Sequence, residues 1–466
     1  MKISGTEITG LTADSRLVKA GYLFAALDSE KVLGSEYIPS AIENGASIIL
    51  GKPEYAKFAK NVTFMAAENS NKKFAELASE FYGEHPKHIA AITGTNGKTS
   101  IADFVRQILT SMGEKAASMG TLGLIKANEA PIPSPNTTPN AVVVAQELSE
   151  LKSEGYNYVC METSSHGLCQ YRVGGVKAEV AGFTNLTRDH LDYHKTFENY
   201  LNAKLILFRE ILQENGVAVL NADIDVYSQI RQACIESGKK VITYGFNGEE
   251  LRLLEAIPES NGQRIRMLYF GKEEEIFVPL AGEFQAMNVL CALGMSAALT
   301  HNPEEVIKHI HKIKGAKGRL DLVGVTKFGA AIYIDYAHTP DALENVLKSM
   351  RSHTKNRLHI LFGCGGDRDA GKRPIMGQIA NDLADEVYVT DDNPRTENAD
   401  NIRNQIMLSC SKGQNIANRA EAIKFAISQL QSGDVLILAG KGHETGQYIN
   451  GKVYPFSDYD EVCKNL

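Results

Sequence analysis

The sequence predicts an α/β protein with three domains, and three observations support this prediction. Its 466 residues fit about three domains of roughly 150 residues each. Short apolar runs rich in β-branched residues alternate with helical patterns, which is typical of parallel sheets covered by helices. A glycine-rich turn at 94–99 separates one such run from a helical pattern, which is the arrangement of a phosphate-binding loop.

Composition and charge exclude several classes of protein. The net charge of −7 argues against a nucleic-acid-binding surface, so no nucleic-acid partner is expected. The N-terminal residues contain no apolar run of signal-peptide length, and no stretch of about twenty uncharged apolar residues predicts a membrane span. The seven cysteines form no C-x-x-C pair and no zinc-ligand spacing, which favours reduced thiols. We therefore expect a cytoplasmic protein.

Residues 1–87 are predicted to form a small α/β domain. The apolar runs at 21–27 and 46–50 indicate buried strands, and the patterns at 37–45 and 71–83 indicate helices that each close at a glycine. Asp14 and Ser15 could simply cap a turn, which is the interpretation their position alone favours. Pro86 is a plausible end of this domain.

Residues 88–316 are predicted to form a second, phosphate-binding domain. The apolar run at 88–93 leads into Gly94 and Gly97, and a helical pattern follows over 101–113. Glycines let backbone N–H groups turn inward, and a helix N-terminus adds partial positive charge. Lys98 would then meet the β- and γ-phosphates of a nucleotide, and the Thr99 hydroxyl would bind Mg²⁺. The alternative is a glycine turn beside a solvated lysine, which the order of strand, turn and helix disfavours.

Two strand ends in this domain carry candidate metal ligands. Glu162 ends a strand expected over 156–162, where a carboxylate is well placed to hold Mg²⁺, although it could instead cap a helix. His190 follows a strand expected over 179–186. A lone histidine is more often structural than a ligand, but this one stands among Asp189, Asp192 and His194, so both roles remain open.

Two polar side chains stand in apolar helical patterns of the same domain. Lys204 belongs to a helix expected over 197–212, where a lysine usually extends its ammonium to solvent. Asn288 lies near the start of an apolar helix within 277–299. It either satisfies a nearby backbone group or faces a ligand, and spacing alone leaves both open.

Residues 317–466 are predicted to form a third domain with a doubly wound parallel sheet. Apolar strands open the segments 330–343, 357–373, 386–398 and 434–448, and each runs into a polar loop that would line a ligand crevice. Paired arginines and carboxylates suit a zwitterionic amino acid, because guanidinium binds carboxylate and carboxylate receives ammonium. Together with ATP–Mg²⁺ chemistry this favours an ATP-driven ligase over a plain ATPase or kinase. The candidates in these loops are Arg368, Asp392, Asn393, Arg395 and Glu444.

The sequence resembles the Mur ligases of bacterial cell-wall synthesis along nearly its whole length. The motifs occur in the family's order, which makes chance agreement very unlikely. They are DSR at 14–16, GTNGKT at 94–99, NTTP at 136–139, METSSHGL at 161–168, TNLTRDHLDYH at 184–194, YLNAKLILF at 200–208, LAGEF followed by Asn288, GRLD at 318–321, DYAHTPDAL at 335–343, GGDRDAGKRP at 365–374, DNPR at 392–395 and AGKGHE at 439–444.

The resemblance implies a UDP-binding N-terminal domain, a central ATPase domain with a phosphate-binding loop and a C-terminal Rossmann-like domain. It implies a reaction in which a substrate carboxylate attacks the γ-phosphate of ATP and an amine then attacks the acyl phosphate. Lys98, Lys204 and His190 would be catalytic; Thr99, Glu162, His190 and a carbamylated Lys204 would serve Mg²⁺. The nucleotide would contact Gly94, Thr95, Asn96, Gly97, Lys98, Thr99, Ser100, Asn288, Arg319 and Asp335.

The resemblance also implies the two other substrates. A UDP-N-acetylmuramoyl-dipeptide would contact Ser15, Asn136, Thr137, Thr138, Ser164, Gln170 and Arg172. DNPR resembles the pattern of family members that add meso-2,6-diaminopimelate, while L-lysine, ornithine or meso-lanthionine remain alternatives. Arg368, Arg395 and Gly440 would bind the distal carboxylate end and Glu444 its ammonium, with Asp392, Asn393 and Pro394 completing the site.

The resemblance leaves three further points: one departure from the family pattern, one rival interpretation and the oligomeric state. The loop at 29–38 departs from the family pattern at Lys31 and Leu33, which puts the uridine contacts there in doubt. A nucleotide-binding regulatory module that keeps the fold without turnover is a rival interpretation, which the intact Lys98, Glu162, Lys204 and His190 disfavour. The protein is expected to be a monomer.

Overall fold

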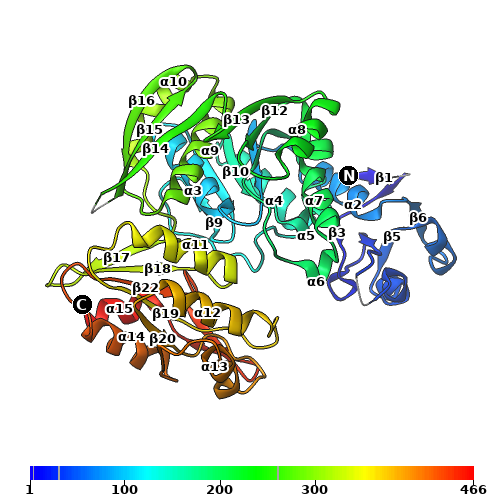
Figure 1. The fold of residues 1–466 in the computed structure, drawn as a ribbon. Helices are drawn as coiled ribbons and strands as arrows, with labels where there is room; N and C mark the ends of the chain where they lie inside the picture. Colours follow the sequence, from blue (N-terminus) through cyan, green and yellow to red (C-terminus); the bar gives the residue numbers. More distant parts are fainter. Residues whose placement is uncertain (4, 30–31, 260–261) are drawn as a thin grey trace.

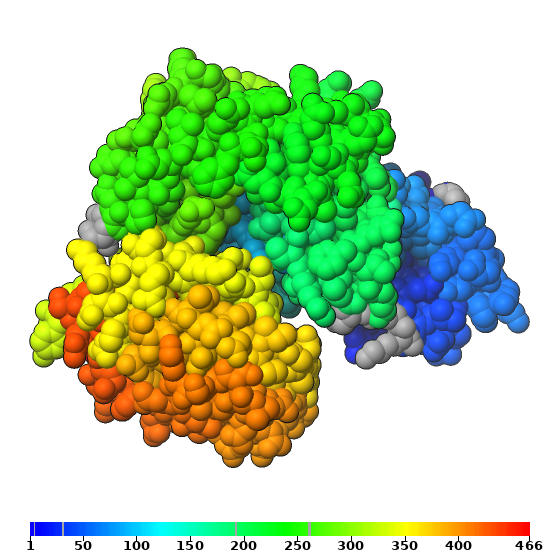
Figure 2. Space-filling model, viewed as in Figure 1, coloured from blue at the N-terminus to red at the C-terminus, as the bar shows by residue number. Residues whose placement is uncertain are grey.

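The computed structural model describes residues 1–3, 5–29, 32–259 and 262–466, and it has three α/β domains. Figure 1 shows the central domain between the N-terminal domain, in blue, and the C-terminal domain, in yellow to red. On the face in Figure 2 both outer domains abut the central one and lie apart from each other. This confirms the predicted α/β class and the number of domains.

The N-terminal domain contains a four-stranded parallel sheet in the order β3-β4-β5-β6. Strands β4 and β5 and helices α1 and α2 fall where the sequence predicts them. The strands are β1 (Lys2–Ile3), β2 (Thr6–Glu7), β3 (Gly10–Thr12), β4 (Tyr22–Ala25), β5 (Ala46–Gly51) and β6 (Thr63–Ala66). The helices are η1 (Ser15–Leu17), η2 (Gly34–Tyr37), α1 (Ile38–Glu43), η3 (Pro53–Phe58) and α2 (Ser70–Tyr82).

The central domain is built on a ten-stranded sheet in the order β16-β15-β14-β13-β12-β11-β7-β10-β8-β9. Its core strands are parallel, whereas β9, β15 and β16 pair antiparallel with their neighbours. The strands are β7 (His88–Thr93), β8 (Ala116–Gly120), β9 (Gly123–Lys126), β10 (Tyr158–Glu162), β11 (Ala178–Phe183), β12 (Leu212–Asn221), β13 (Lys240–Gly245), β14 (Leu251–Glu259), β15 (Gly262–Tyr269) and β16 (Lys272–Val278).

Helices cover both faces of the central sheet. Buried residues of α3 and α9 form one apolar core with the sheet, and those of α4, α7 and α8 form the other. The helices are α3 (Lys98–Ser111), α4 (Ala141–Ser153), α5 (Ser165–Cys169), α6 (Leu191–His194), α7 (Phe197–Ile206), the π-helical η4 (Leu207–Ile211), α8 (Tyr227–Glu236), α9 (Glu283–Thr300), α10 (Pro303–Lys308) and η5 (Ile310–Lys312).

The C-terminal domain contains a six-stranded sheet in the order β17-β18-β22-β19-β20-β21, parallel except for β17. Helices pack on both faces, as predicted for a doubly wound sheet. The strands are β17 (Asp321–Val325), β18 (Ala331–Asp335), β19 (Leu358–Phe362), β20 (Glu386–Val389), β21 (Gly413–Asn415), β22 (Val435–Ala439), β23 (Gly446–Ile449) and β24 (Lys452–Pro455). The helices are α11 (Pro340–Arg351), α12 (Lys372–Leu383), α13 (Ala399–Met407), α14 (Arg419–Ser428) and α15 (Asp458–Asn465).

Two expected helices differ in detail from the structure. The helix expected over 101–113 begins earlier, because Lys98 and Thr99 already form its first turn. The helix expected over 197–212 changes to π-helical geometry at Leu207, and β12 begins at Leu212. Within the described ranges, no helix is long and apolar enough to cross a membrane.

Candidate active site between the central and C-terminal domains

The phosphate-binding loop connects β7 to α3, in the middle of the central sheet. Gly94 and Gly97 have φ angles of 143° and 88°, which residues with a Cβ rarely adopt. A Cβ at Gly94 would overlap the Thr184 hydroxyl, and one at Gly97 would lie 2.5 Å from Asn288 Oδ1. Thr184 in turn donates a hydrogen bond of 2.6 Å to the Asn96 carbonyl. The loop therefore needs glycine at both positions.

Two lysines converge on this loop. Lys98 Nζ donates to the carbonyls of Gly94 and Thr95 at 2.9 and 2.8 Å, and Lys204 Nζ donates to the Gly94 carbonyl at 2.8 Å. Lys204 is 1 % exposed and lies 4.4 Å from the centre of the Tyr200 ring, so it does not extend to solvent. Burial, reinforced by the charge of Lys98, lowers the pKa of Lys204 well below its ordinary value.

Glu162 at the end of β10 is held by groups from two neighbouring segments. Its Oε2 accepts hydrogen bonds from the hydroxyls of Thr99 and Thr121 at 2.9 and 3.2 Å, and its Oε1 accepts one from the Thr121 amide at 2.7 Å. Glu162 is 2 % exposed, and the cap of α5 is Ser164, so Glu162 is not a helix cap. A buried carboxylate beside Thr99 suits a divalent cation.

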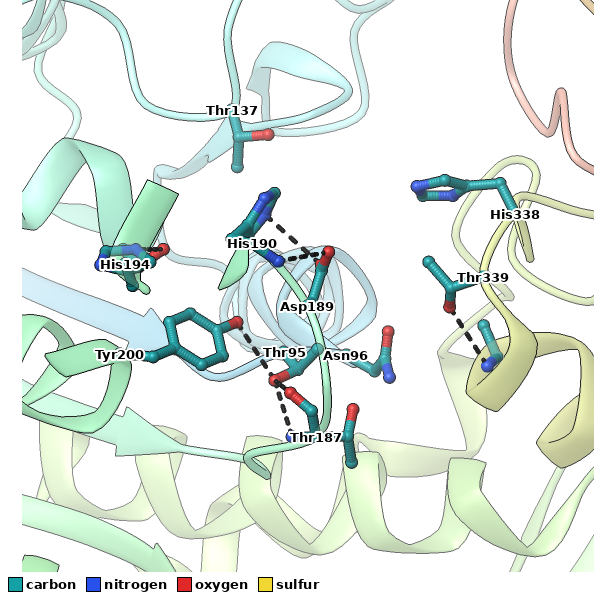
Figure 3. A network of polar contacts seen from close by, with 12 residues as sticks. Thr95, Asn96, Thr137, Thr187, Asp189, His190, His194, Tyr200, His338 and Thr339 are labelled. Carbon is teal, nitrogen blue, oxygen red and sulfur yellow. Dashed lines mark hydrogen bonds and ion pairs between the residues drawn. The ribbon is translucent and has the colours of Figure 1, made fainter. Parts of the chain in front are cut away.

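His190 lies on the loop after β11, facing the same region. It has a φ of 53° and forms the start of α6, and its ring lies 3.4 Å from Asp189 Oδ2. Figure 3 shows Thr137 on one side of His190, and His338 from the C-terminal domain pointing toward it. The side chain of Asp192 lies outside the described part of the chain, whereas His194 Nε2 lies 2.9 Å from the Ser165 hydroxyl.

The candidate nucleotide contacts lie where the two domains meet. Asn288 donates to Gln285 at 2.9 Å, so it contacts both a side chain and the glycine loop. Arg319 Nη2 lies 3.4 Å from the Thr99 hydroxyl, and its guanidinium stacks 4.5 Å from the centre of the Tyr336 ring. Asp335 accepts the amides of Leu320 and Ala337 at 2.7 Å each. Thr95 and Ser100 belong to the same loop and helix.

Most of the expected UDP-substrate residues form a cluster around α5. Thr138 donates to the Glu162 carbonyl at 3.0 Å and accepts the Ser164 amide at 2.9 Å. Arg172 donates to the Thr138 carbonyl at 2.7 Å and to Gln170 at 3.0 and 2.8 Å. Thr137 is 3.0 Å from Thr121, linking the cluster to Glu162.

The two remaining expected UDP contacts, Asn136 and Ser15, lie outside this cluster. Asn136 is exposed on the proline-rich loop. Ser15 is in the N-terminal domain at the start of η1, which Asp14 caps by accepting the Arg16 amide, so the capping interpretation of Asp14 is confirmed. Of the divergent pair at 29–38, Lys31 lies outside the described residues and Leu33 is 54 % exposed.

The candidate amino-acid site forms at the carboxyl ends of β19, β20 and β22. Arg395 has a φ of 52° and donates to the Gly366 carbonyl at 2.8 Å, and Asn393 donates to Glu444 at 2.9 Å. Asp392, Asn393 and Pro394 are buried, and a Cβ at Gly440 would lie 2.8 Å from Asp392. Arg368 is exposed on the loop after β19.

One cavity joins the edges of the two domains. It has a volume of about 1200 Å³ and is lined by Thr121, which bonds Glu162, and by Glu444, which bonds Asn393. Lys314 and Lys317 from the interdomain connection and Tyr448 from β23 also line it. The cavity therefore reaches the bonding partners of Glu162 and of Asn393, although its lining includes no residue of the phosphate loop at 94–99 and none of 392–395.

The structure adds functional candidates that sequence reasoning missed. Thr121 fixes Glu162, and Tyr200 lies 3.2 Å from the Thr95 hydroxyl (Figure 3). Asp341 at the start of α11 accepts hydrogen bonds from Asn96 and Thr187, both at 3.1 Å, across the domain boundary. No local pattern reveals these pairings, because each joins segments at least 41 residues apart.

Comparison with known families covers most of the chain. Residues 7–82 match the Mur ligase family catalytic domain, residues 92–296 the Mur ligase middle domain, and residues 318–442 the Mur ligase glutamate ligase domain. The expected domain boundaries at 87/88 and 316/317 fall between these matches, although the matches do not test them.

Relatives with curated names agree with these families. The UDP-N-acetylmuramoyl-L-alanyl-D-glutamate--2,6-diaminopimelate ligase of Bradyrhizobium diazoefficiens is 43% identical over 100% of this chain and 96% of its own length. The enzyme of that name from Caulobacter vibrioides is 44% identical over 98% of this chain and 95% of its own. A solved structure of a ligase with that name has 32% identity and a TM-score of 0.73, covering 98% of this chain and 94% of that one. This chain belongs to the Mur ligase family.

Proposed function

We propose that this chain is an ATP-dependent ligase that adds meso-2,6-diaminopimelate to UDP-N-acetylmuramoyl-L-alanyl-D-glutamate in peptidoglycan synthesis. The observation that carries the proposal is the cavity lined both by Thr121, beside Glu162, and by Glu444, beside Asn393. The phosphate loop also faces the C-terminal domain, since Asn96 donates to Asp341 at 3.1 Å and Arg319 lies 3.4 Å from the Thr99 hydroxyl. The names of the full-length relatives supply the substrates.

The proposed chemistry has two steps. A carboxylate oxygen of the UDP-dipeptide attacks the γ-phosphorus of ATP. The bond between this phosphorus and the oxygen that bridges the β- and γ-phosphates breaks, which releases ADP and leaves an acyl phosphate. The amine then attacks the acyl carbon, inorganic phosphate leaves with the C–O electron pair, and the ammonium proton passes to solvent. Lys98 and the amides at the start of α3 stabilise charge on the transferred phosphoryl group. Asn288, Arg319 and Asp335 hold the nucleotide.

The donor set suits Mg²⁺. Thr99 and Glu162 offer adjacent oxygens, while the described residues contain no group of three His, Cys, Asp or Glu side chains able to hold a metal. This fits an ion that keeps several waters and binds through one or two carboxylates plus substrate phosphates. When bound, the ion neutralises phosphate charge. His190 and a carbamylated Lys204 complete the proposed ligands.

The surroundings of Lys204 support the proposed carbamylation. A neutral amine is required to attack CO₂, giving a carbamate anion and releasing a proton. Burial and Lys98 lower the pKa of Lys204, which raises the neutral fraction. The product would be an anion beside the phosphate loop, where the charge of Lys98 attracts it.

A panel of radiolabelled amino acids tests the proposed function. With the UDP-dipeptide and ATP, we expect incorporation of 2,6-diaminopimelate over L-lysine and ornithine, with meso-lanthionine as the nearest competitor. Incorporation of L-lysine alone would replace the substrate assignment. ATP hydrolysis that does not depend on the UDP-dipeptide, without product, would favour a nucleotide-binding regulatory module.

Arg395→Ala tests the amino-acid end specifically. Because Arg395 is proposed to bind the distal carboxylate, we expect KM for diaminopimelate to rise tenfold or more, which corresponds to about 1.4 kcal/mol. KM for ATP and for the UDP-dipeptide should change little. Equal losses for all three substrates would contradict this role.

A further inference from the structure

Lys441 is a fully buried lysine in the loop after β22, in contact with Asn393 and Glu444 of the candidate amino-acid site. It is 0 % exposed, and its Nζ donates to Asn393 Oδ1 at 3.1 Å, to Glu444 Oε2 at 2.9 Å and to the Gly446 carbonyl at 2.7 Å. These acceptors account for all three hydrogens of an ammonium group. Burying a lysine is costly unless its charge is paired, so this arrangement is a built feature of the fold.

The three bonds of Lys441 fix the orientation of the neighbouring side chains. Because Asn393 Oδ1 accepts from Lys441 and from the Tyr448 amide at 3.0 Å, its amide nitrogen is turned toward Glu444 Oε2. Glu444 Oε2 is then shared by Lys441 and Asn393. Within the described part of the chain, Oε1 of Glu444 has no hydrogen-bond partner, so it can receive an incoming ammonium.

Through its hydrogen bond to the Gly446 carbonyl, Lys441 also holds the start of the hairpin formed by β23 and β24. Arg395 donates its amide to the Tyr448 carbonyl at 2.9 Å, and its own carbonyl accepts the Asn450 amide at 2.7 Å. The hairpin thus holds the backbone of Arg395, while Lys441 holds the start of the hairpin. One buried cation connects Asn393, Glu444 and the strand that supports Arg395.

We propose that Lys441 is a positioning residue that also sets which diamino acid the site accepts, an inference that rests on the proposed function. Its charge offsets that of Glu444, which would otherwise add a negative charge to the site beside the guanidinium of Arg395, whose field also reaches Asp367. Such a site favours an amino acid that brings a second carboxylate, as 2,6-diaminopimelate does. It disfavours L-lysine, which carries a net positive charge and has no second carboxylate.

The test compares Lys441→Met with the unmodified enzyme on the two amino acids. We expect the ratio of kcat/KM for diaminopimelate to that for L-lysine to fall at least tenfold, mainly through a higher KM for diaminopimelate. KM for ATP should stay within about twofold, since Lys441 is not in the phosphate loop. Lys424→Met, on the exposed face of α14, is the matched control and should leave the ratio unchanged.

A double-mutant cycle separates positioning from a structural role. If Lys441 acts through Glu444, then Lys441→Met in a Glu444→Gln background should change the ratio by less than twofold. The inference would be overturned if Lys441→Met lowered activity on both amino acids in equal proportion. It would also be overturned if the changes in the kcat/KM ratio caused by the two single substitutions multiplied in the double variant. If the unmodified enzyme does not use diaminopimelate, the proposed function is wrong. The assay of the unmodified enzyme therefore distinguishes this outcome from a failure of the inference about Lys441.

Discussion

At the scale of single residues, Lys204 illustrates how burial changes the chemistry of a lysine. Its side chain is buried beside Lys98, and both effects lower its pKa, so the neutral amine that the proposed carbamylation requires is favoured. We predict that Lys204→Met lowers kcat by tenfold to a hundredfold, the range typical when support of a metal site is lost. The measurement is the steady-state rate at saturating substrates.

Removal of dissolved CO₂ provides the companion measurement for Lys204. The unmodified enzyme should lose activity reversibly in CO₂-free buffer and regain it when bicarbonate is added, whereas Lys204→Met should not respond. Glu198→Gln, on the same helix, is the control and should respond as the unmodified enzyme does. Full activity of the unmodified enzyme after prolonged CO₂ removal would contradict carbamylation.

His443 gives a residue-scale prediction about pH. Burial, with the charges of Arg319 and Lys317, lowers the pKa of His443 to about 4, and its Nδ1 is buried without a hydrogen-bond partner. In the unfolded chain a histidine titrates near 6.5. Between these values the unfolded state binds the extra proton, so stability is lost as the pH falls from about 6.5 toward 4.

The corresponding experiment measures Tm between pH 7 and pH 5. We expect Tm to fall over this range, and His443→Gln to make the fall shallower because a neutral side chain cannot take up the proton. His311→Gln, at an exposed position, is the control. If His443→Gln leaves the change of Tm with pH unaltered, His443 does not contribute to the pH dependence of stability.

The residue scale also shows what the sequence could and could not predict. Lys98, Thr99 and Glu162 were predictable because strand, turn and helix patterns place them locally. The burial of Lys204 was not, because the carbonyl that its ammonium contacts belongs to Gly94 in the loop after β7, 110 residues away. For Lys441, the loop position was visible, but its contact with Asn393 depends on how β20 and β22 end beside β19.

At the scale of elements, the phosphate-binding loop depends on glycine geometry. An alanine at position 97 would be strained at φ 88° and would meet Asn288 Oδ1 at 2.5 Å. Left-handed backbone costs other residues about 1–2 kcal/mol, and displacement of Asn288 adds to this. We therefore predict that Gly97→Ala weakens ATP binding by tenfold or more, measured by titration calorimetry.

Gly113, at the other end of α3, supplies a matched control for this prediction. It has a similar φ of 94°, but no atom lies within 4 Å of the position its Cβ would take. Gly113→Ala should therefore lower the free energy of unfolding without changing ATP affinity. Equal effects of the two substitutions on ATP binding would mean that general strain, rather than the loop, is responsible.

Some elements had a sequence signal that was not interpreted. In β15, polar Arg264 and Arg266 alternate with apolar Ile265 and Met267, and burial alternates with them along 263–269, the period expected of a half-exposed antiparallel strand. The antiparallel extension β14–β16 was therefore detectable in principle. The change to π-helical geometry at Leu207 was not, because the apolar pattern continues without a break through residue 212.

At the scale of the whole molecule, the site exists only because two domains meet. Asp341 is a direct link: its Oδ2 on α11 accepts from Asn96 in the phosphate loop and from Thr187 after β11, both at 3.1 Å. Sequence patterns predict each domain separately, since apolar periodicity reports on one core at a time. They carry no information on which polar residue of one domain bonds the loop of another.

Removing this link should loosen the arrangement of the domains. Hydrogen bonds to a charged group contribute about 1.5–3 kcal/mol when buried and less when partly exposed, as here. We predict that Asp341→Ala increases the radius of gyration of the ligand-free enzyme in small-angle scattering. KM for ATP should rise severalfold, because the enzyme must first reassemble the closed cleft before it binds nucleotide productively.

Glu344 on the same helix offers the matched control for Asp341. It also carries a carboxylate, but its ion pair is with Lys348 on α11 itself, so Glu344→Ala removes the same charge without touching the central domain. Such a helical pair contributes about 0.3–0.5 kcal/mol, so radius and KM should stay close to those of the unmodified enzyme. An unchanged radius in Asp341→Ala with a raised KM would place the effect in the phosphate loop alone, through Asn96, and would remove the argument for a link between domains.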